Sequence, residues 1–489
     1  MMVRRFIFML GMSLLPALMV AGAAAEGRVI TLDMAIATAQ TNSVEAAAAL
    51  DELHTALWQH RIYRAGLLPE LSFDATVPSY SRSYNRWQAE DGSYRFVRTG
   101  SLEASAALTL SQSIWLTGGT VSLTSRLDYM RQLDGSHDNS FMALPVALTL
   151  RQPLFAANTV KWNRRIEPLR LREARAQYTG ASELVAVEVV EHYFALLLAR
   201  EEVSSAEQNL ENAVRMAEAA RIKRAMGQIS RNDSMQIELT LLTAQSELTA
   251  GRSSARATAM QLGSFIGLDD AGTLEAVEPS VPVIPEISYE RVLEQALAAN
   301  ALTVSVRRRQ LEADFEVARA RGAQREVTLF AQVGFSGADA AIGEAYGRLH
   351  DNSIVQIGMS IPLVDWGKRR AAVRMAESRS ELVRNTLRKE VIDFRLNLFV
   401  LVERLNNQAG QYRLAYSACD IAQRRYDSMV ETFLTGRIST LDLTDAQQAK
   451  DRARAKLLDE LRLWWSYYYQ LRSLTLHDPA TDIPLDNSD

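Results

Sequence analysis

The sequence predicts a mixed α and β fold made of two similar halves, each with alternating strands and a long helical hairpin. Three observations support this prediction. Long proline-free stretches are rich in Ala, Glu, Arg, Leu and Gln, which favour helices. Several segments alternate apolar and polar residues, as half-buried strands do. Motifs recur at fixed offsets along the chain, which indicates a tandem internal duplication.

The first 25 residues have the layout of a bacterial secretory signal peptide. Two arginines precede an apolar run from Phe6 to Val20, and three alanines before Glu26 form a small-residue cleavage site. We therefore expect residues 1–25 to be removed. A membrane anchor is the alternative, but the apolar run is short and the small residues follow it closely.

The composition narrows the class of protein. Apolar residues make up 47% of the 489 residues and charged residues 23%, as in folded proteins. The net charge of −4 gives no reason to expect a nucleic-acid partner. Cys419 is the only cysteine, which excludes an internal disulfide. Beyond the signal, no stretch of 18 uninterrupted apolar residues predicts a membrane-spanning helix. The exported chain is therefore either free in the periplasm or inserted as a barrel.

Two repeats follow the signal peptide. ITLDMAIATAQTNS at residues 30–43 resembles ISYERVLEQALAAN at residues 287–300, with an offset of 257. At the strand ends QPLF and IPLV the offset has become 209, as Pro153 and Pro362 show. The first half therefore carries about 48 additional residues (257 − 209).

These offsets predict the domain boundaries. We expect a first repeat at 26–278, a proline-rich linker at 279–286, a second repeat at 287–475 and a C-terminal tail at 476–489. The additional residues fall at about 74–140. The sequence leaves open whether they lengthen strands, form a surface loop or add a periplasmic hairpin.

Alternating segments about ten residues long occur in both halves. They are LEASAALTLSQ (102–112), VSLTSRLDY (121–129) and VALTLRQPL (146–154) in the first half, and IVQIGMSIPL (354–363), within strands expected at about 327–364, in the second. Strands of this length and pattern suit an outer-membrane barrel. From the pattern alone, a half-buried sheet in a soluble domain is an equal alternative.

The proline-free stretches show a helical period as well. Apolar or small residues step by three and four along a helix expected from about Glu167 to Met226, as in a coiled-coil seam. A helix of that length is too long for a globular core, so we expect a projecting helical hairpin.

GQISRND at residues 227–233 recurs as GRISTLD at residues 436–442, again 209 positions later. Each copy reads as the tip of a helical hairpin, with a left-handed glycine ending one helix and a serine capping the next. An aspartate follows near the positive end of the returning helix. The residues are Gly227, Ser230 and Asp233 in the first tip and Gly436, Ser439 and Asp442 in the second. Capping does not explain Asp445, one turn further on.

With these motifs the chain resembles the TolC-type outer-membrane efflux proteins over nearly all of residues 28–475. The resemblance implies that three chains each give four strands to one 12-stranded outer-membrane β-barrel, continued by a long periplasmic α-helical coiled-coil barrel. It also implies a periplasmic gate at the hairpin tips, where a periplasmic adaptor docks. Asp442 and Asp445 match two aspartate rings, Asp233 matches an acidic position, and Phe433 stands at an aromatic one. The arginine of the family's gate is not matched, because Ile438 occupies its place.

The function implied is the exit duct of a tripartite efflux system in the bacterial outer membrane. A homotrimer would passively conduct drugs or other small molecules from an inner-membrane transporter (RND, ABC or MFS type) through an adaptor, or membrane fusion protein. We expect no enzymatic activity, cofactor or metal, because HExxH, GxxxxGK[ST] and GxGxxG motifs are absent. The alternatives are a type I protein secretion duct and, in a different class, a soluble periplasmic coiled-coil adaptor or scaffold.

Overall fold

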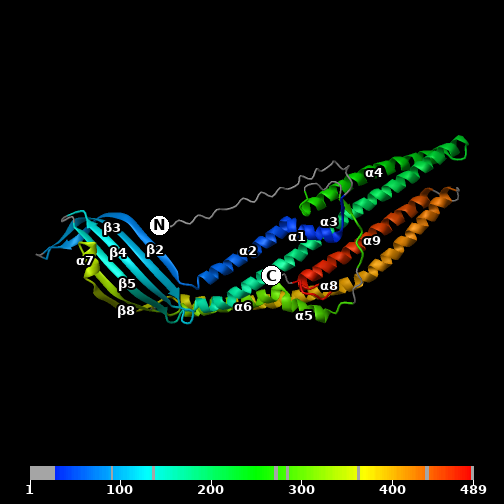
Figure 1. The fold of residues 1–489 in the computed structure, drawn as a ribbon. Helices are drawn as coiled ribbons and strands as arrows, with labels where there is room; N and C mark the ends of the chain where they lie inside the picture. The colour runs from blue at the N-terminus through cyan, green and yellow to red at the C-terminus, as the bar shows by residue number, and fades with distance from the viewer. Residues whose placement is uncertain are drawn as a thin grey trace, which may run out of the picture. The chain divides into compact units, whose positions relative to one another are not determined.

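The computed structural model describes residues 28–89, 92–134, 138–268, 274–281, 286–360, 364–434 and 440–485 (Figure 1). The expected signal peptide and part of the expected linker lie outside these ranges. The chain divides into two compact units. The tip unit comprises Met1–Ala39, Val189–Ser280 and Ala422–Leu458, and the sheet unit comprises Gln40–Glu188, Val281–Ile421 and Asp459–Asp489.

The first half of the chain contains four helices and six strands among its described residues. They are β1 (Arg28–Ile30), α1 (Leu32–Asn42), α2 (Val44–Ala65), β2 (Glu70–Gln88), β3 (Tyr94–Ser113), β4 (Thr120–Gln132), β5 (Asn139–Pro153), α3 (Thr159–Ala225), α4 (Arg231–Phe265) and β6 (Leu274–Ala276).

The second half repeats most of this order, which confirms the duplication. It contains α5 (Tyr289–Ala299), α6 (Ala301–Gly322), β7 (Glu326–Asp339), α7 (Ile342–Gly347), β8 (His350–Ser360), α8 (Lys368–Leu434) and α9 (Thr440–Thr475). Helices α5 and α6 have the bounds of α1 and α2 shifted by 257, and α8 has those of α3 shifted by 209.

One antiparallel sheet dominates the sheet unit, in the order β2-β3-β4-β5-β7-β8. It has six strands where four were expected from this chain. The reason is the insertion, which supplies β3 and β4 as a hairpin paired on both sides. The position of the hairpin also resolves what the sequence left open: the additional residues belong to the sheet.

The two faces of this sheet differ in polarity. The apolar face exposes large side chains from all six strands: Leu71 and Phe73, Leu108 and Leu110, Leu123, Val146 and Leu148, Val333 and Phe335, and Val355 and Ile357. The opposite face is mainly polar or small, with Phe330 and Ile354 as apolar exceptions. The hydroxyls of Thr109 and Thr124 lie 3.4 Å apart there. An apolar face left exposed across a whole sheet is typical of a surface that contacts lipid.

Helix α3 begins eight residues before the expected Glu167 and contains Pro168. Its start is set by Asn158, whose side-chain oxygen accepts a hydrogen bond from the backbone N–H of Lys161 at 2.9 Å. The amide nitrogen of Asn158 donates to the carbonyls of Trp115 and Leu116, in the turn between β3 and β4. The inserted hairpin is therefore tied to the helix that continues from the sheet.

Four helices of the sheet unit form a row of neighbours. Helix α3 meets α6 through Arg308, whose guanidinium lies 2.9 Å from Glu173. This hydrogen bond raises the pKa of Arg308. Helix α6 meets α8 through Arg309 and Glu390, 2.7 Å apart. Helix α2 lies near α3, since Tyr63 on α2 is close enough for the charges of Arg164 and Glu167 on α3 to act on its partly exposed hydroxyl. The order of the row is therefore α2-α3-α6-α8.

In the part of the chain that is described, no helix has the length and apolar content needed to cross a membrane.

In the tip unit, a buried tyrosine holds the short parallel pair β1 and β6 together. The ring of Tyr193 is fully buried, and its hydroxyl lies 2.9 Å from the carbonyl of Ile30 and 2.7 Å from that of Val277. It also accepts a hydrogen bond from the backbone N–H of Val277. Burial raises the pKa of Tyr193 to about 12, so the folded state favours the neutral hydroxyl.

Replacing this hydroxyl tests the clamp. Tyr193→Phe removes the nearer acceptor of the Val277 N–H, which keeps only a 3.4 Å hydrogen bond to the carbonyl of Ile30. We expect a loss of about 1 kcal/mol in the free energy of local opening. Because the folded pKa is raised, the hydroxyl's contribution is complete below pH 10 and is lost as the pH rises towards 12. Hydrogen exchange at Val277 measures the first effect and pH-dependent thermal unfolding the second. Tyr416→Phe, at an exposed position, is the control. Equal exchange rates in the two variants would contradict the prediction.

Candidate functional site

The first hairpin tip has the predicted geometry. Gly227 has a φ of +69°, and α3 ends in a pair of hydrogen bonds, from Gly227 N–H to Arg224 and from Gln228 N–H to Lys223. This pair of hydrogen bonds is common where a helix ends at a left-handed glycine. Ser230 then caps α4 by accepting a hydrogen bond from the N–H of Asp233 at 3.1 Å.

The carboxylate of Asp233 is part of the same cap. It accepts hydrogen bonds from the backbone N–H of Ser230 at 3.2 Å and from its hydroxyl at 2.7 Å. The two residues therefore form a reciprocal capping box. This local role accounts for an aspartate at position 233, so Asp233 is the weakest of the three aspartates among the four gate candidates.

The second tip is described only on its flanks. Gly436 and Ser439 lie outside the described residues, and Phe433 is placed only as backbone in the last turn of α8. Helix α9 begins at Thr440, the position that corresponds to the start of α4. Asp442 lies in its first turn and Asp445 one turn later, and both are exposed.

A basic residue partly neutralises one of these aspartates. The guanidinium of Arg425 on α8 lies 2.9 Å from the carboxylate of Asp445, and both side chains are about half exposed. Beneath this pair, Tyr426, Leu443 and Ala446 form a small buried core. That core fixes α8 against α9, with Asp445 directed towards Arg425.

Polar contacts join the two hairpins inside the tip unit, and the sequence reasoning missed them. Asn212 on α3 donates to the hydroxyl of Tyr426 on α8 at 2.7 Å. Ser205 on α3 donates to Asp451 on α9 at 2.5 Å. The ammonium group of Lys450, almost fully buried, lies 3.4 Å from Asp451 and 4.7 Å from the ring centre of Tyr426.

No motif marks these residues, because each is an ordinary polar residue beside the apolar seam. The offset of 209 aligns Tyr426 with Ala217 in the seam of the first hairpin, and both residues are buried. Burial raises the pKa of the Tyr426 hydroxyl. The spacing of apolar residues along the seam predicts that the ring is buried. The contact between its hydroxyl and Asn212 follows only from the packing of α3 against α8. The contacts therefore link the first hairpin to the second one near the tips.

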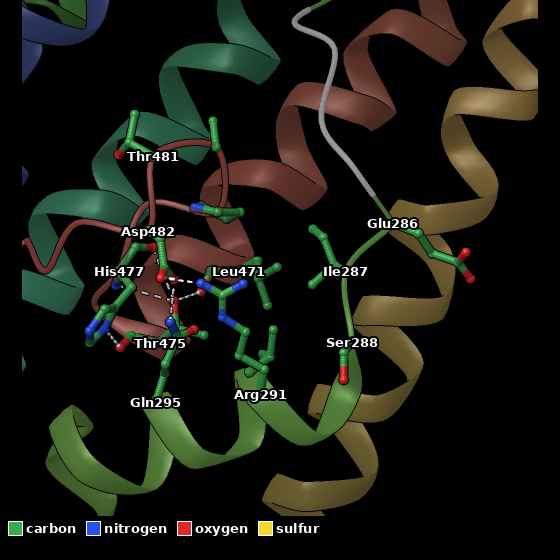
Figure 2. Close-up of a pocket in the computed structure, with 13 residues that line it drawn as sticks. Glu286, Ile287, Ser288, Arg291, Gln295, Leu471, Thr475, His477, Thr481 and Asp482 are labelled. Atoms are coloured by element: carbon green, nitrogen blue, oxygen red, sulfur yellow. Dashed lines mark hydrogen bonds and ion pairs between the residues drawn. The ribbon is translucent and has the colours of Figure 1, made fainter.

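A cavity of about 220 Å³ lies in the sheet unit, between α5, the end of α9 and the C-terminal segment (Figure 2). In Figure 2, Arg291 and Gln295 of α5 point towards Asp482. Asp482 pairs with Arg291 and accepts a hydrogen bond from Gln295 at 2.6 Å. These contacts hold the expected C-terminal tail against the second repeat.

Within the described ranges, no cluster of three or more His, Cys, Asp or Glu residues is placed to hold a metal ion.

The tip geometry predicts that Gly227 and Ser230 both stabilise the turn between α3 and α4. Gly227→Val places a side chain on a left-handed backbone, and Ser230→Ala removes the cap; each should cost about 1 kcal/mol locally. Hydrogen exchange in the first turn of α4 should become faster, adaptor docking should weaken, and insertion into the membrane should persist. Ser253→Ala, at an exposed position within α4, is the control. Loss of insertion with normal docking would contradict the assignment of the tip.

Comparison with known proteins gives independent evidence on the family of this chain. The profile of a family described as outer membrane efflux protein matches residues 35–268 and 295–475. The cobalt-zinc-cadmium resistance protein CzcC of Cupriavidus metallidurans is 24% identical over 300 residues, which cover 60% of this chain and 68% of CzcC.

Solved structures show the same fold. The CmeC outer membrane channel of Campylobacter jejuni superposes with a TM-score of 0.65 at 16% identity, covering 91% of this chain and 85% of CmeC. The outer membrane protein VceC of Vibrio cholerae gives a TM-score of 0.65 at 14% identity, covering 91% and 95% of the two chains.

Proposed function

The chain belongs to the outer membrane efflux protein family, and we propose that it is the exit duct of a tripartite efflux system. Three copies would form one channel, with the sheet in the outer membrane and the helical hairpins in the periplasm. An inner-membrane transporter of the RND, ABC or MFS type would supply the energy, and an adaptor would dock at the hairpin tips. The duct itself would carry out no chemical reaction.

The observation that carries this proposal is the exposed apolar face of the sheet. In lipid, a sheet must have no open edge, because unpaired backbone N–H and C=O groups find no water there. Strands β2 and β8 are the edges of the described sheet, so a single chain leaves two open edges. Pairing with further copies of the chain closes them.

The same observation disfavours the soluble adaptor. An adaptor in the periplasm has no use for large apolar side chains exposed on all six strands. The type I secretion duct shares this architecture and differs in its cargo and pump. We propose small molecules as the cargo.

The proposed domain organisation follows from the duplication. It comprises a signal peptide at 1–25, repeats at 26–278 and 287–475, the linker between them, and a tail at 476–489. Each repeat supplies one hairpin, and its tip would contribute to the periplasmic gate.

We assign the gate to Asp442, Asp445, Asp233 and Phe433. Three copies of the two aspartates on α9 would bring up to six carboxylates to a narrow opening. Such a ring favours cations, as in cation-selective pores. Arg425 opposes this charge in each copy, since it pairs with Asp445.

The first prediction from this proposal concerns assembly. The protein should fractionate with the outer membrane and migrate as a trimer on gels run without heating. The physical reason is the pair of open sheet edges, which only further copies can close. A monomer in the soluble periplasmic extract would contradict the channel.

The second prediction concerns the gate charges. Asp442→Ala combined with Asp445→Ala should weaken cation selectivity and cation block in single-channel recordings, because the carboxylate rings are lost. Arg425→Gln should act in the opposite direction and strengthen selectivity, because it frees the charge of Asp445.

Asp233→Asn is the matched control, and its effect should be smaller because Asp233 serves the cap of α4. Wild-type selectivity in the double variant, with no change in Arg425→Gln, would show that these aspartates lie away from the pore. The gate would then have to be assigned to other residues.

A further inference from the structure

We propose that the inserted hairpin β3–β4 crosses the membrane, so that three copies of this chain close an eighteen-stranded barrel. The number follows from six strands per chain, where the resemblance implied four. This inference rests on the proposed trimer, but it concerns a separate property, the number of strands that each copy contributes.

The hairpin lies within the sheet, between β2 and β5. Its two strands match the alternating segments predicted at 102–112 and 121–129. Strand β3 pairs with β2 from Glu70↔Ser111 to Gln88↔Tyr94, and β4 pairs with β5 from Thr120↔Arg151 to Arg131↔Asn139. If the hairpin lay outside the membrane, β2 and β5 would have to pair with each other, and the ladders that each makes with the hairpin would not exist. With the hairpin in place, every strand between β2 and β8 is paired on both sides, as lipid requires.

The side chains of the hairpin follow the pattern of the neighbouring strands. In the ladder, Leu108 is opposite Phe73 on β2, and Leu123 is opposite Leu148 on β5. Leu108 is 46% exposed and Leu123 42%, close to the 51% of Leu148. The same apolar band therefore continues across the hairpin, which a surface loop or a periplasmic hairpin would not need.

Strand directions also permit closure. All neighbouring strands are antiparallel, so the first strand, β2, and the sixth, β8, run in opposite directions. The β2 edge of one copy can therefore pair with the β8 edge of the next as another antiparallel ladder. A barrel of three such copies has an even number of strands, as single-chain bacterial outer-membrane barrels do.

The helices next to the sheet match six strands better than four. Strands about 4.8 Å apart and tilted by about 40° each occupy about 6.3 Å of circumference, so six occupy about 38 Å and four about 25 Å. The row α2-α3-α6-α8 places four helices beside the sheet. At spacings of 8–10 Å they occupy about 32–40 Å. Six strands therefore continue the helical wall without a step in its width.

The consequence is a wide opening in the outer membrane. Eighteen strands close at a backbone diameter of about 36 Å, against about 24 Å for twelve. Barrels of 16–18 strands leave an aqueous channel. The membrane section of this duct would then not limit the passage of cargo, and any restriction would lie at the hairpin tips.

Cysteine labelling tests whether the hairpin crosses the membrane. In a Cys419→Ser background, single cysteines are placed on the apolar face by Leu108→Cys and Leu123→Cys, and on the polar face by Thr109→Cys and Thr124→Cys. Leu148→Cys and Thr149→Cys on β5 are the matched controls. The probe is a membrane-impermeant maleimide applied to outer membranes that contain the trimer.

We expect labelling at the threonine positions and its loss at the leucine positions, as on β5. Equal labelling of both faces of β3 and β4, with alternation kept on β5, would place the hairpin outside the membrane and overturn the inference.

Electron cryo-microscopy of the wild-type trimer in nanodiscs gives a second readout that needs no variant. Eighteen strands support the inference, whereas a trimer with twelve overturns it and leaves the proposed duct intact. Failure to form a trimer contradicts both, and the two failures are therefore distinguishable.

Discussion

The backbone hydrogen bonds of the sheet are the constraint on which the rest of this structure depends. Six strands with an exposed apolar face cannot leave the N–H and C=O groups of β2 and β8 unpaired in lipid. That single requirement links the fold to assembly, because a chain that cannot close its own sheet needs copies of itself. It also explains why the insertion is a complete hairpin. Adding two strands preserves the alternation of directions, whereas adding one would leave the edges parallel.

In the helical hairpins, the constraint is a different one: the helices must be held in one arrangement. Long helices with small residues along their seam pack closely but hold few specific contacts. In the tip unit, specificity comes from polar links such as Asn212 to Tyr426 and Ser205 to Asp451, which join α3 to the second hairpin. Because these groups are partly buried, the loss of a partner is costly, so the links favour one arrangement of the hairpins over others. The proposed gate at the hairpin tips would require such a preference.

The aspartates show how one motif serves two different needs. In the first tip, the carboxylate of Asp233 completes the cap of α4. In the second, Asp445 lies a turn beyond the capping position and pairs with Arg425. The two copies of the motif therefore differ in the described partners of their aspartates: a cap at Asp233 and an arginine at Asp445.

The sequence by itself determined the duplication, the helical hairpins, the caps at Gly227 and Ser230, and the alternating strands. These features depend on local propensity and on periodicity, which a linear chain displays directly. The tertiary structure decided what the 48 additional residues do, since strand pairing joins segments far apart in sequence and neither β3 nor β4 indicates its neighbours. It also decided the partners of Tyr426, Asp445 and Arg308. Such pairs depend on which helix faces meet, and packing over the whole chain sets that arrangement.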